Sequence, residues 1–121
     1  MREALEPGLT ENQLWAILHE TNIAMGGEWI ETRLLASGGR TNPWFQECGD
    51  KVIRAGELVA FDTDLIGPFG YCADISRTYF CGPGRPSDEQ KRIYAMARDQ
   101  IETNIALLAP GMTFRELAEK G

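Results

Sequence analysis

Between positions 10 and 25, apolar side chains recur at the spacing of one face of an α-helix. They are Leu14, Trp15, Ile17, Leu18 and Ile23. Thr10 and Gln13 have the spacing of a capping box, in which each side chain bonds the backbone of the other residue. Gly26 and Gly27 then stop the pattern, so a helix is predicted over residues 10–25.

Three apolar segments in the middle of the chain are predicted to be β-strands. They cover residues 29–36, 58–66 and 71–80. Gly and Pro at positions 67–70 give the composition of a turn. The last two segments are therefore expected to pair as an antiparallel hairpin.

A second helical pattern covers residues 87–108 and opens with a capping box at Ser87 and Gln90. Its apolar face consists of Ile93, Met96, Ala97, Ile101, Ile105 and Leu108. Thr113 and Glu116 have the same capping spacing and begin a third helix near Gly121. The sequence therefore predicts helical structure after the hairpin.

One short pattern occurs twice in the chain. Pro-Gly-x-Thr, with Leu four residues after the Thr, begins at position 7 and again at position 110. A turn followed by a capped helix is common, so coincidence stays open as an explanation. A true repeat would mean that the chain holds one half of a duplicated fold.

The composition is that of a globular domain, with 43% hydrophobic and 25% charged residues among 121. The chain has no apolar run of about 18 residues and no apolar segment near Met1 like that of a signal peptide. We therefore expect a cytoplasmic protein without a membrane partner. A net charge of −6 argues against a nucleic-acid partner. Three cysteines without a Cys-x-x-Cys spacing, and a single histidine, argue against a zinc knuckle or a His-rich metal site.

Three aspartates lie inside the two strands of the predicted hairpin, where a charge is costly beside apolar neighbours. Asp62 and Asp64 are two residues apart and therefore point to the same face of the strand. The turn brings Asp74 back toward them. Carboxylates that converge repel one another, and bound divalent cations resolve this repulsion most directly. Clustered oxygens suit ions such as Mg, Mn or Fe, and bridging carboxylates can hold two of them.

A second interpretation of the same residues remains open. Aspartate is common near turns, so the three could form a solvated strand end in which Asp74 pairs with Arg77 on the surface. Arg77 could instead orient a carboxylate ligand or bond to the local backbone.

At these residues the chain resembles the aminopeptidase P/creatinase metalloenzymes, which have the pita-bread fold. That family has an Asp in an apolar strand, a short hairpin, and then Asp-x-Ser/Thr-Arg-Thr, and residues 74–78 read Asp-Ile-Ser-Arg-Thr. The resemblance covers nearly the whole chain. It implies the α+β class and a partial pita-bread fold, with an antiparallel sheet and helices packed on one face. It further implies that residues 1–121 are a truncated N-terminal half of the catalytic domain, without its second half and without an N-terminal domain.

The resemblance also implies a metal site. Asp74 matches the second aspartate ligand of the family, and Thr63 stands where the first is usual, so Asp62 and Asp64 are expected to take its place. The implied cofactor is a pair of divalent ions, with iron suggested. The remaining ligands, one His and two Glu, and the catalytic base are expected beyond Gly121. No catalytic residue is therefore assigned in this chain.

A departure from the family's peptidases bears on the reaction. They carry a His shortly before the metal strand, where residues 43–45 here read Pro-Trp-Phe. Trp44 has no basic nitrogen and cannot shuttle a proton. With Asp-Thr-Asp and Tyr-Cys-Ala-Asp around the site, the chain resembles the family's branch of dimethylsulfoniopropionate lyases. This implies β-elimination of the small molecule dimethylsulfoniopropionate to dimethyl sulfide and acrylate by a homodimer.

Two other functions stay open, namely an Xaa-Pro dipeptidase or aminopeptidase P-like metallohydrolase, and a non-catalytic pita-bread binding domain. Three aromatic side chains also allow two interpretations. Trp44, Phe45 and Tyr71 could line a pocket for the sulfonium group through cation–π contacts. The simpler expectation is that they pack into the core.

Overall fold

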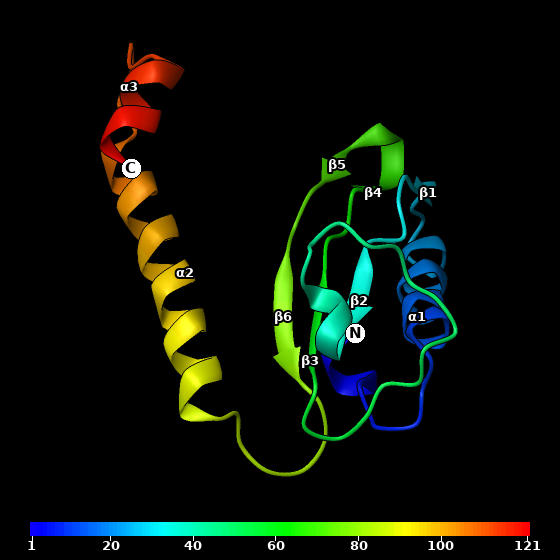
Figure 1. Ribbon diagram of the computed structural model, residues 1–121. Coiled ribbons are helices and arrows are strands. Elements are labelled where there is room, and N and C mark those ends of the chain that lie inside the picture. Colours follow the sequence, from blue (N-terminus) through cyan, green and yellow to red (C-terminus); the bar gives the residue numbers. More distant parts are fainter. The chain divides into compact units, whose positions relative to one another are not determined.

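The computed structural model describes residues 1–121, which form two compact units, Met1–Arg85 and Pro86–Gly121. The first unit contains one α-helix and all the strands, and the second is helical (Figure 1). The elements are α1 (Glu11–Ala24), β1 (Trp29–Ile30), β2 (Leu35–Ser37), β3 (Leu58–Phe61), β4 (Leu65–Ile66), β5 (Cys72–Ala73), β6 (Arg77–Phe80), α2 (Asp88–Leu107) and α3 (Phe114–Lys120). No helix combines the length and the apolar composition needed to cross a bilayer.

The strands form two antiparallel sheets of three strands each, in the orders β1-β4-β5 and β2-β3-β6. The predicted hairpin is confirmed, because β4 pairs with β5 and β3 pairs with β6. The prediction of three continuous strands was wrong. Each predicted strand is interrupted at the same level and contributes one piece to each sheet.

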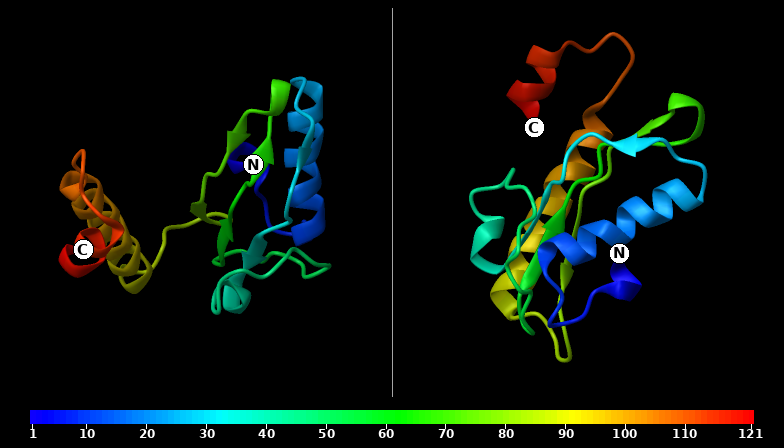
Figure 2. Two further views of the ribbon diagram at one scale, coloured as in Figure 1. Left: turned by 90° about the horizontal axis from the view of Figure 1, so that it is seen from above. Right: turned by 90° about the vertical axis from the view of Figure 1, so that its right-hand side faces the viewer.

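The core of the first unit lies between α1 and the strands. Its buried side chains are Leu14, Trp15, Ile30, Leu35, Cys48, Ile53, Val59, Phe61 and Cys81. Helix α1 contacts β1 and β2 and lies along one face of the strands (Figure 2). All three cysteines are free thiols. The α+β class with an antiparallel sheet and a covering helix is thus confirmed.

The helix predicted over residues 10–25 is confirmed as α1, but its buried face differs near the C-terminal end. Ile23, expected on the apolar face, is 55% exposed. Asn22 is buried instead, and its amide donates to the carbonyl oxygens of Trp29 and Ile66, each at 3.3 Å. The helix is therefore tied to β1 and β4 by a polar side chain that helical periodicity does not detect.

All three predicted capping boxes are present. The hydroxyls of Thr10, Ser87 and Thr113 accept from the backbone amide three residues later at 3.1, 3.1 and 3.2 Å. Gly8 and Gly111 both have positive φ, of 106° and 86°, in the turns that precede α1 and α3. The two copies of the repeated sequence pattern therefore adopt the same turn and capped helix.

Candidate metal centre

The candidate site lies where the long hairpin is interrupted. Residues 62–64 separate β3 from β4, and residues 74–76 separate β5 from β6. Phe61 pairs with Arg77 before the interruption and Leu65 pairs with Ala73 after it. This is one continuous register, so Thr63 lies opposite Ile75 although backbone pairing is absent there.

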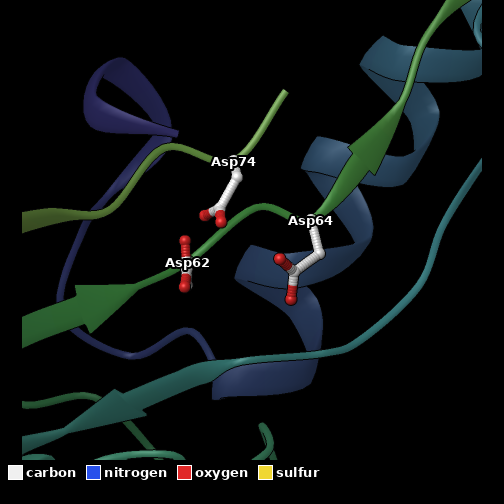
Figure 3. Close-up of side chains that lie close together, drawn as sticks. All are labelled: Asp62, Asp64 and Asp74. Atoms are coloured by element: carbon white, nitrogen blue, oxygen red, sulfur yellow. The ribbon is translucent and has the colours of Figure 1, made fainter. Parts of the chain in front are cut away.

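The three predicted aspartates meet at this interruption (Figure 3). One carboxylate oxygen from each of Asp62, Asp64 and Asp74 lies within 4.8 Å of the others. Asp62 is only 8% exposed, Asp64 is half-buried and Asp74 is exposed. In Figure 3 the carboxyl groups of Asp62 and Asp74 face each other across the two strands. The predicted convergence of the three side chains is confirmed.

An irregularity in the neighbouring segment accompanies this arrangement. Ile30 pairs with Leu65 and Leu35 pairs with Phe61, so residues 31–34 face the shorter segment 62–64. One extra residue on one strand is the mark of a β-bulge, which bends the strand and re-aims side chains. Asp64 also has a positive φ of 33°, a conformation that aspartate tolerates better than most residues. The bulge and this backbone conformation explain why the predicted strands are interrupted here.

The carboxylates have no cationic side chain to balance them. None of the ion pairs in the structure includes Asp62, Asp64 or Asp74. A hydrogen bond shared with the Asp62 carboxyl, together with the negative charges of Asp62 and Asp64, raises the pKa of Asp74 above its usual value. Arg77 donates to the carbonyl oxygen of Ser76 at 2.7 Å. Of the roles considered for Arg77, the bond to local backbone is the one observed.

Two threonines that sequence reasoning did not select hold the site. The Thr63 hydroxyl donates to the carbonyl oxygen of Ala73 at 3.1 Å and accepts from the Ile75 amide at 3.0 Å. The Thr32 hydroxyl donates to Asp64 Oδ2 at 2.8 Å. Thr63 could have been suspected from its place between two aspartates, but Thr32 is 32 residues from its partner and carries no local signal.

The donor set fits divalent cations that prefer oxygen. Three carboxylates at short range supply several oxygen ligands, and their mutual repulsion is relieved when a cation binds among them. Because Asp74 is exposed, the site is open toward solvent. Such a site can hold a metal that also binds an anionic group of a substrate.

The aromatic side chains considered for a substrate pocket do not pack the core. Phe45 is 71% exposed and Tyr71 is 78% exposed, so the simpler expectation was wrong for both. Trp44 is half-buried, and its ring centroid lies 6.0 Å from that of Phe45. The loop that holds both rings therefore presents apolar surface to solvent.

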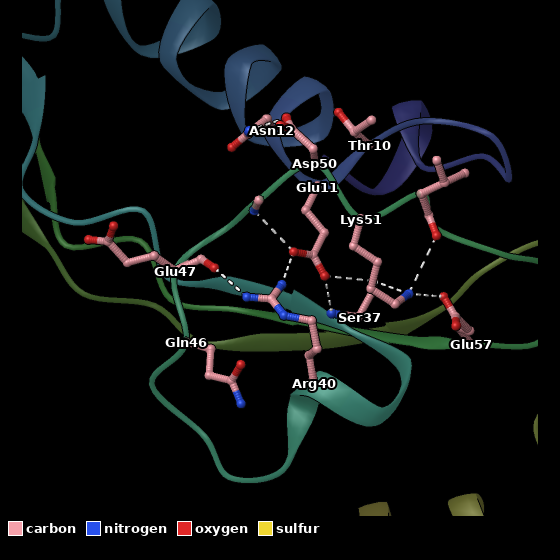
Figure 4. A network of polar contacts seen from close by, with 12 residues as sticks. Thr10, Glu11, Asn12, Ser37, Arg40, Gln46, Glu47, Asp50, Lys51 and Glu57 are labelled. Atoms are coloured by element: carbon pink, nitrogen blue, oxygen red, sulfur yellow. Dashed lines mark hydrogen bonds and ion pairs between the residues drawn. The ribbon is translucent and has the colours of Figure 1, made fainter.

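A buried polar network fixes the segment that precedes β3 (Figure 4). The Glu11 carboxylate, on the first turn of α1, is fully buried. It accepts from the backbone amide and hydroxyl of Ser37 at 2.8 Å each, from the amide of Gly49 at 3.1 Å, and from Arg40. Lys51 donates to Ser37 Oγ at 2.8 Å and to Glu57 at 2.7 Å. The network joins the start of α1 to both ends of the loop at residues 38–50.

The chain matches one protein family and is similar to two named relatives. The model of metallopeptidase family M24 matches residues 1–120. The chain is 54% identical to dimethylsulfoniopropionate lyase DddP of Roseovarius nubinhibens over 98% of its own length, and 51% identical to the protein of that name from Roseobacter denitrificans over 97%. It spans only 27% and 26% of the lengths of these relatives.

A solved structure shows the same fold. The X-Pro aminopeptidase from Thermotoga maritima superposes with a TM-score of 0.88 at 28% sequence identity, and the match covers 97% of this chain and 33% of that one. The expected partial pita-bread fold is thereby confirmed. Divalent metal binding is what this family implies for the acidic cluster at the hairpin interruption.

Proposed function

The chain belongs to metallopeptidase family M24, and from this premise we propose that it is the metal-binding part of a lyase. The reaction is the cleavage of dimethylsulfoniopropionate to dimethyl sulfide and acrylate. The observation that carries the proposal is the convergence of Asp62, Asp64 and Asp74. The high identity to relatives named as such lyases supports the choice of reaction over peptide hydrolysis.

The proposed reaction is a β-elimination. A base removes a proton from the carbon beside the substrate carboxylate, and that electron pair forms the double bond of acrylate. The carbon–sulfur bond breaks, and its electron pair leaves with the sulfur as dimethyl sulfide. No base is assigned to this chain, since the resemblance places it beyond Gly121.

Asp62, Asp64 and Asp74 would hold the cofactor, which we propose to be two divalent ions, with iron as the suggested metal. When bound, such ions supply positive charge next to the substrate carboxylate, where negative charge develops during the elimination. The chain's own contribution is positional. Thr63 N–H donates to Asp62 Oδ1 at 3.0 Å and Thr32 holds Asp64, so two of the three carboxylates are already oriented.

We also propose that residues 1–121 are the N-terminal half of a pita-bread catalytic domain whose second half supplies one His and two Glu ligands. The chain covers about a third of the solved aminopeptidase, which accords with that size. A homodimer and a cytoplasmic location stay predictions of the sequence.

An Xaa-Pro metallohydrolase is the second candidate, because the solved structure that shares the fold is named an X-Pro aminopeptidase. For that reaction, ions held by Asp62, Asp64 and Asp74 would supply the positive charge that activates water toward a peptide carbonyl. Trp44 weighs against it, because an indole nitrogen has no lone pair to accept a proton at the position where these peptidases carry a His.

The test uses the whole metal-loaded protein with two substrates. Release of dimethyl sulfide from dimethylsulfoniopropionate, measured by gas chromatography, is expected without release of proline from an Xaa-Pro dipeptide. Asp74→Ala should lower the lyase rate by more than about 100-fold, since a direct ligand is worth more than the outer contacts that cost 10–100-fold. Asp99→Ala, at an exposed carboxylate of α2, is the matched control.

Each other result points to a different function. Proline release without dimethyl sulfide would identify the metallohydrolase. No turnover of either substrate, with the same metal content in wild type and Asp74→Ala, would identify a non-catalytic binding domain and contradict the ligand assignment.

A further inference from the structure

Two threonine hydroxyls form hydrogen bonds at the interruption of the hairpin. Thr63 is 8% exposed, and its side chain points across the interruption to the opposite strand. Thr32 lies on the segment that faces residues 62–64 from the other side. Neither threonine caps a helix or lies within a strand, so the hydrogen bonds of these hydroxyls do not serve regular secondary structure.

The Thr63 hydroxyl bonds to both chain neighbours of Asp74. It donates to the carbonyl oxygen of Ala73 at 3.1 Å and accepts from the amide of Ile75 at 3.0 Å. These two bonds replace the missing ladder contacts with a single oxygen atom. The backbone on either side of Asp74 is therefore fixed, although the Asp74 side chain itself is exposed.

Thr32 acts on the carboxylate of Asp64 directly. Its hydroxyl donates to Asp64 Oδ2 at 2.8 Å. The backbone amide of the preceding residue, Glu31, donates to the Asp64 carbonyl oxygen at 3.1 Å. Asp64 is thus held at its side chain and its backbone. Its positive φ of 33° makes such support necessary, since this conformation is otherwise unfavourable.

We propose that Thr32 and Thr63 are positioning residues of the metal centre. They hold Asp64 and Asp74 close to Asp62 before a cation arrives, against the repulsion of three like charges. Outer contacts of this kind orient ligands so that a metal binds without rearrangement. The inference rests on the proposed function, because it requires that the aspartates bind metal.

The test is a titration of the metal-free whole protein with Mn²⁺, followed by calorimetry. Valine keeps the shape of threonine without its hydroxyl, and serine keeps the hydroxyl. Thr63→Val and Thr32→Val should weaken Mn²⁺ binding by about 10–100-fold. Thr63→Ser and Thr32→Ser should restore most of the affinity.

The matched control is Thr41→Val, which removes a hydroxyl that donates to the Gly38 carbonyl oxygen at 2.8 Å, away from the aspartates. It should leave the Mn²⁺ affinity unchanged. The melting temperature of each metal-free variant is measured as well. A merely structural role for the two threonines would lower that temperature while the affinity stays at the wild-type value, and this result would overturn the proposal.

Asp74→Asn, titrated with Mn²⁺ in parallel, distinguishes a failure of the metal centre from a failure of the positioning role of the threonines. Lost binding in Asp74→Asn with unchanged binding in both valine variants would refute the positioning role and leave the metal centre intact. Unchanged binding in Asp74→Asn would refute the metal centre itself. If Thr63→Val does not fold, Thr32→Val decides the question, because Thr32 is only half-buried.

Discussion

Glu11 is a fully buried acidic residue in the first unit of the protein. Its side chain has no exposed surface, and both carboxylate oxygens accept hydrogen bonds from the loop at residues 38–50 and its flanks. Arg40 balances the charge, and its other nitrogen donates to the Glu47 carbonyl oxygen at 2.8 Å. A buried carboxylate with this many donors is stable only while all of them are present.

Removing the Glu11 carboxylate should therefore be costly. Glu11→Ala is expected to lower the free energy of unfolding by about 3–5 kcal/mol, because Arg40 and the Ser37 and Gly49 amides lose their acceptor. Urea unfolding followed by circular dichroism measures this change. The exposed Glu20 on the same helix offers a matched control, and Glu20→Ala should stay within about 0.5 kcal/mol of wild type. Equal midpoints for the two variants would contradict the structural role of the network.

The neighbouring Glu57 shows how partners outweigh burial at a single residue. Burial acts to raise the pKa of its carboxyl group, but the hydrogen bond from Lys51 and the one from the Arg54 amide together lower it below its usual value. Glu57 holds Lys51, which also donates to Ser37 Oγ. Burial raises the pKa of the Cys48 and Cys81 thiols, which disfavours their reactive thiolate form.

Among the elements, helix α1 begins at a complete capping box. Thr10 Oγ1 accepts from the Gln13 amide at 3.1 Å, and Gln13 Oε1 accepts from the Thr10 amide at 2.8 Å. These bonds satisfy backbone donors that have no partner within the helix. The cap is also next to Glu11, so the start of α1 serves both the helix and the buried network.

Loss of this cap should have a measurable and limited effect. Thr10→Ala is expected to lower the free energy of unfolding by about 1 kcal/mol, whereas Thr10→Ser should keep most of the stability. Thermal or urea unfolding of the two variants against wild type provides the comparison. A cost as large as that of Glu11→Ala would mean that Thr10 supports the buried network rather than the helix alone.

The positions of the strands were predicted correctly, but their interruptions were not. Alternating and continuous apolar residues identify segments that can pair, and they did so for the hairpin. The interruptions at residues 31–34, 62–64 and 74–76 depend on a bulge between two strands that are distant in sequence. A bulge is a property of the pairing, so the periodicity of one strand does not reveal it.

At the scale of the whole molecule, metal binding is coupled to stability. A ligand that binds only the folded state stabilises it in proportion to the logarithm of its concentration, by about 2.7 kcal/mol at one hundred times its dissociation constant. Asp74 meets Asp62 and Asp64 only through the pairing of the hairpin, so the site exists only after folding. Without metal, the same carboxylates oppose folding through their mutual repulsion.

This coupling predicts that replacing Asp74 raises the melting temperature without metal and removes the rise that Mn²⁺ causes. The hydrogen bond shared with Asp62 and the nearby negative charges raise the pKa of Asp74, so ionising this carboxyl costs more in the folded protein than in the unfolded chain. Asp74→Asn removes one of the repelling charges and should raise the melting temperature of the metal-free protein. In the wild type, added Mn²⁺ should raise the melting temperature, and in Asp74→Asn this response should be lost. Calorimetric scans with Mn²⁺ and with a chelator measure both effects.

Two outcomes would count against this account. A lower melting temperature of metal-free Asp74→Asn would mean that the Asp74 carboxylate stabilises the folded state without a cation. An undiminished response of this variant to Mn²⁺ would place the cation elsewhere in the protein.

The sequence alone determined those features that depend on neighbours in the chain. The spacing of Thr10 and Gln13, of Ser87 and Gln90, and of the apolar helix positions defined helix starts and lengths, because helical contacts join residues three or four apart. Asp62 and Asp64 were placed on one side of a strand because side chains two residues apart share a strand face. The turn at residues 67–70 was expected to bring Asp74 into their vicinity.

Tertiary structure decided which polar groups are buried and what they bond. Glu11 meets Ser37 across 26 residues of chain, and Thr32 meets Asp64 across 32. Whether such a pair forms depends on how α1 and the strands pack, and no local pattern records it. The sequence thus provides the three carboxylates, whereas the packed hairpin and its bulge set the distances that allow them to share a cation.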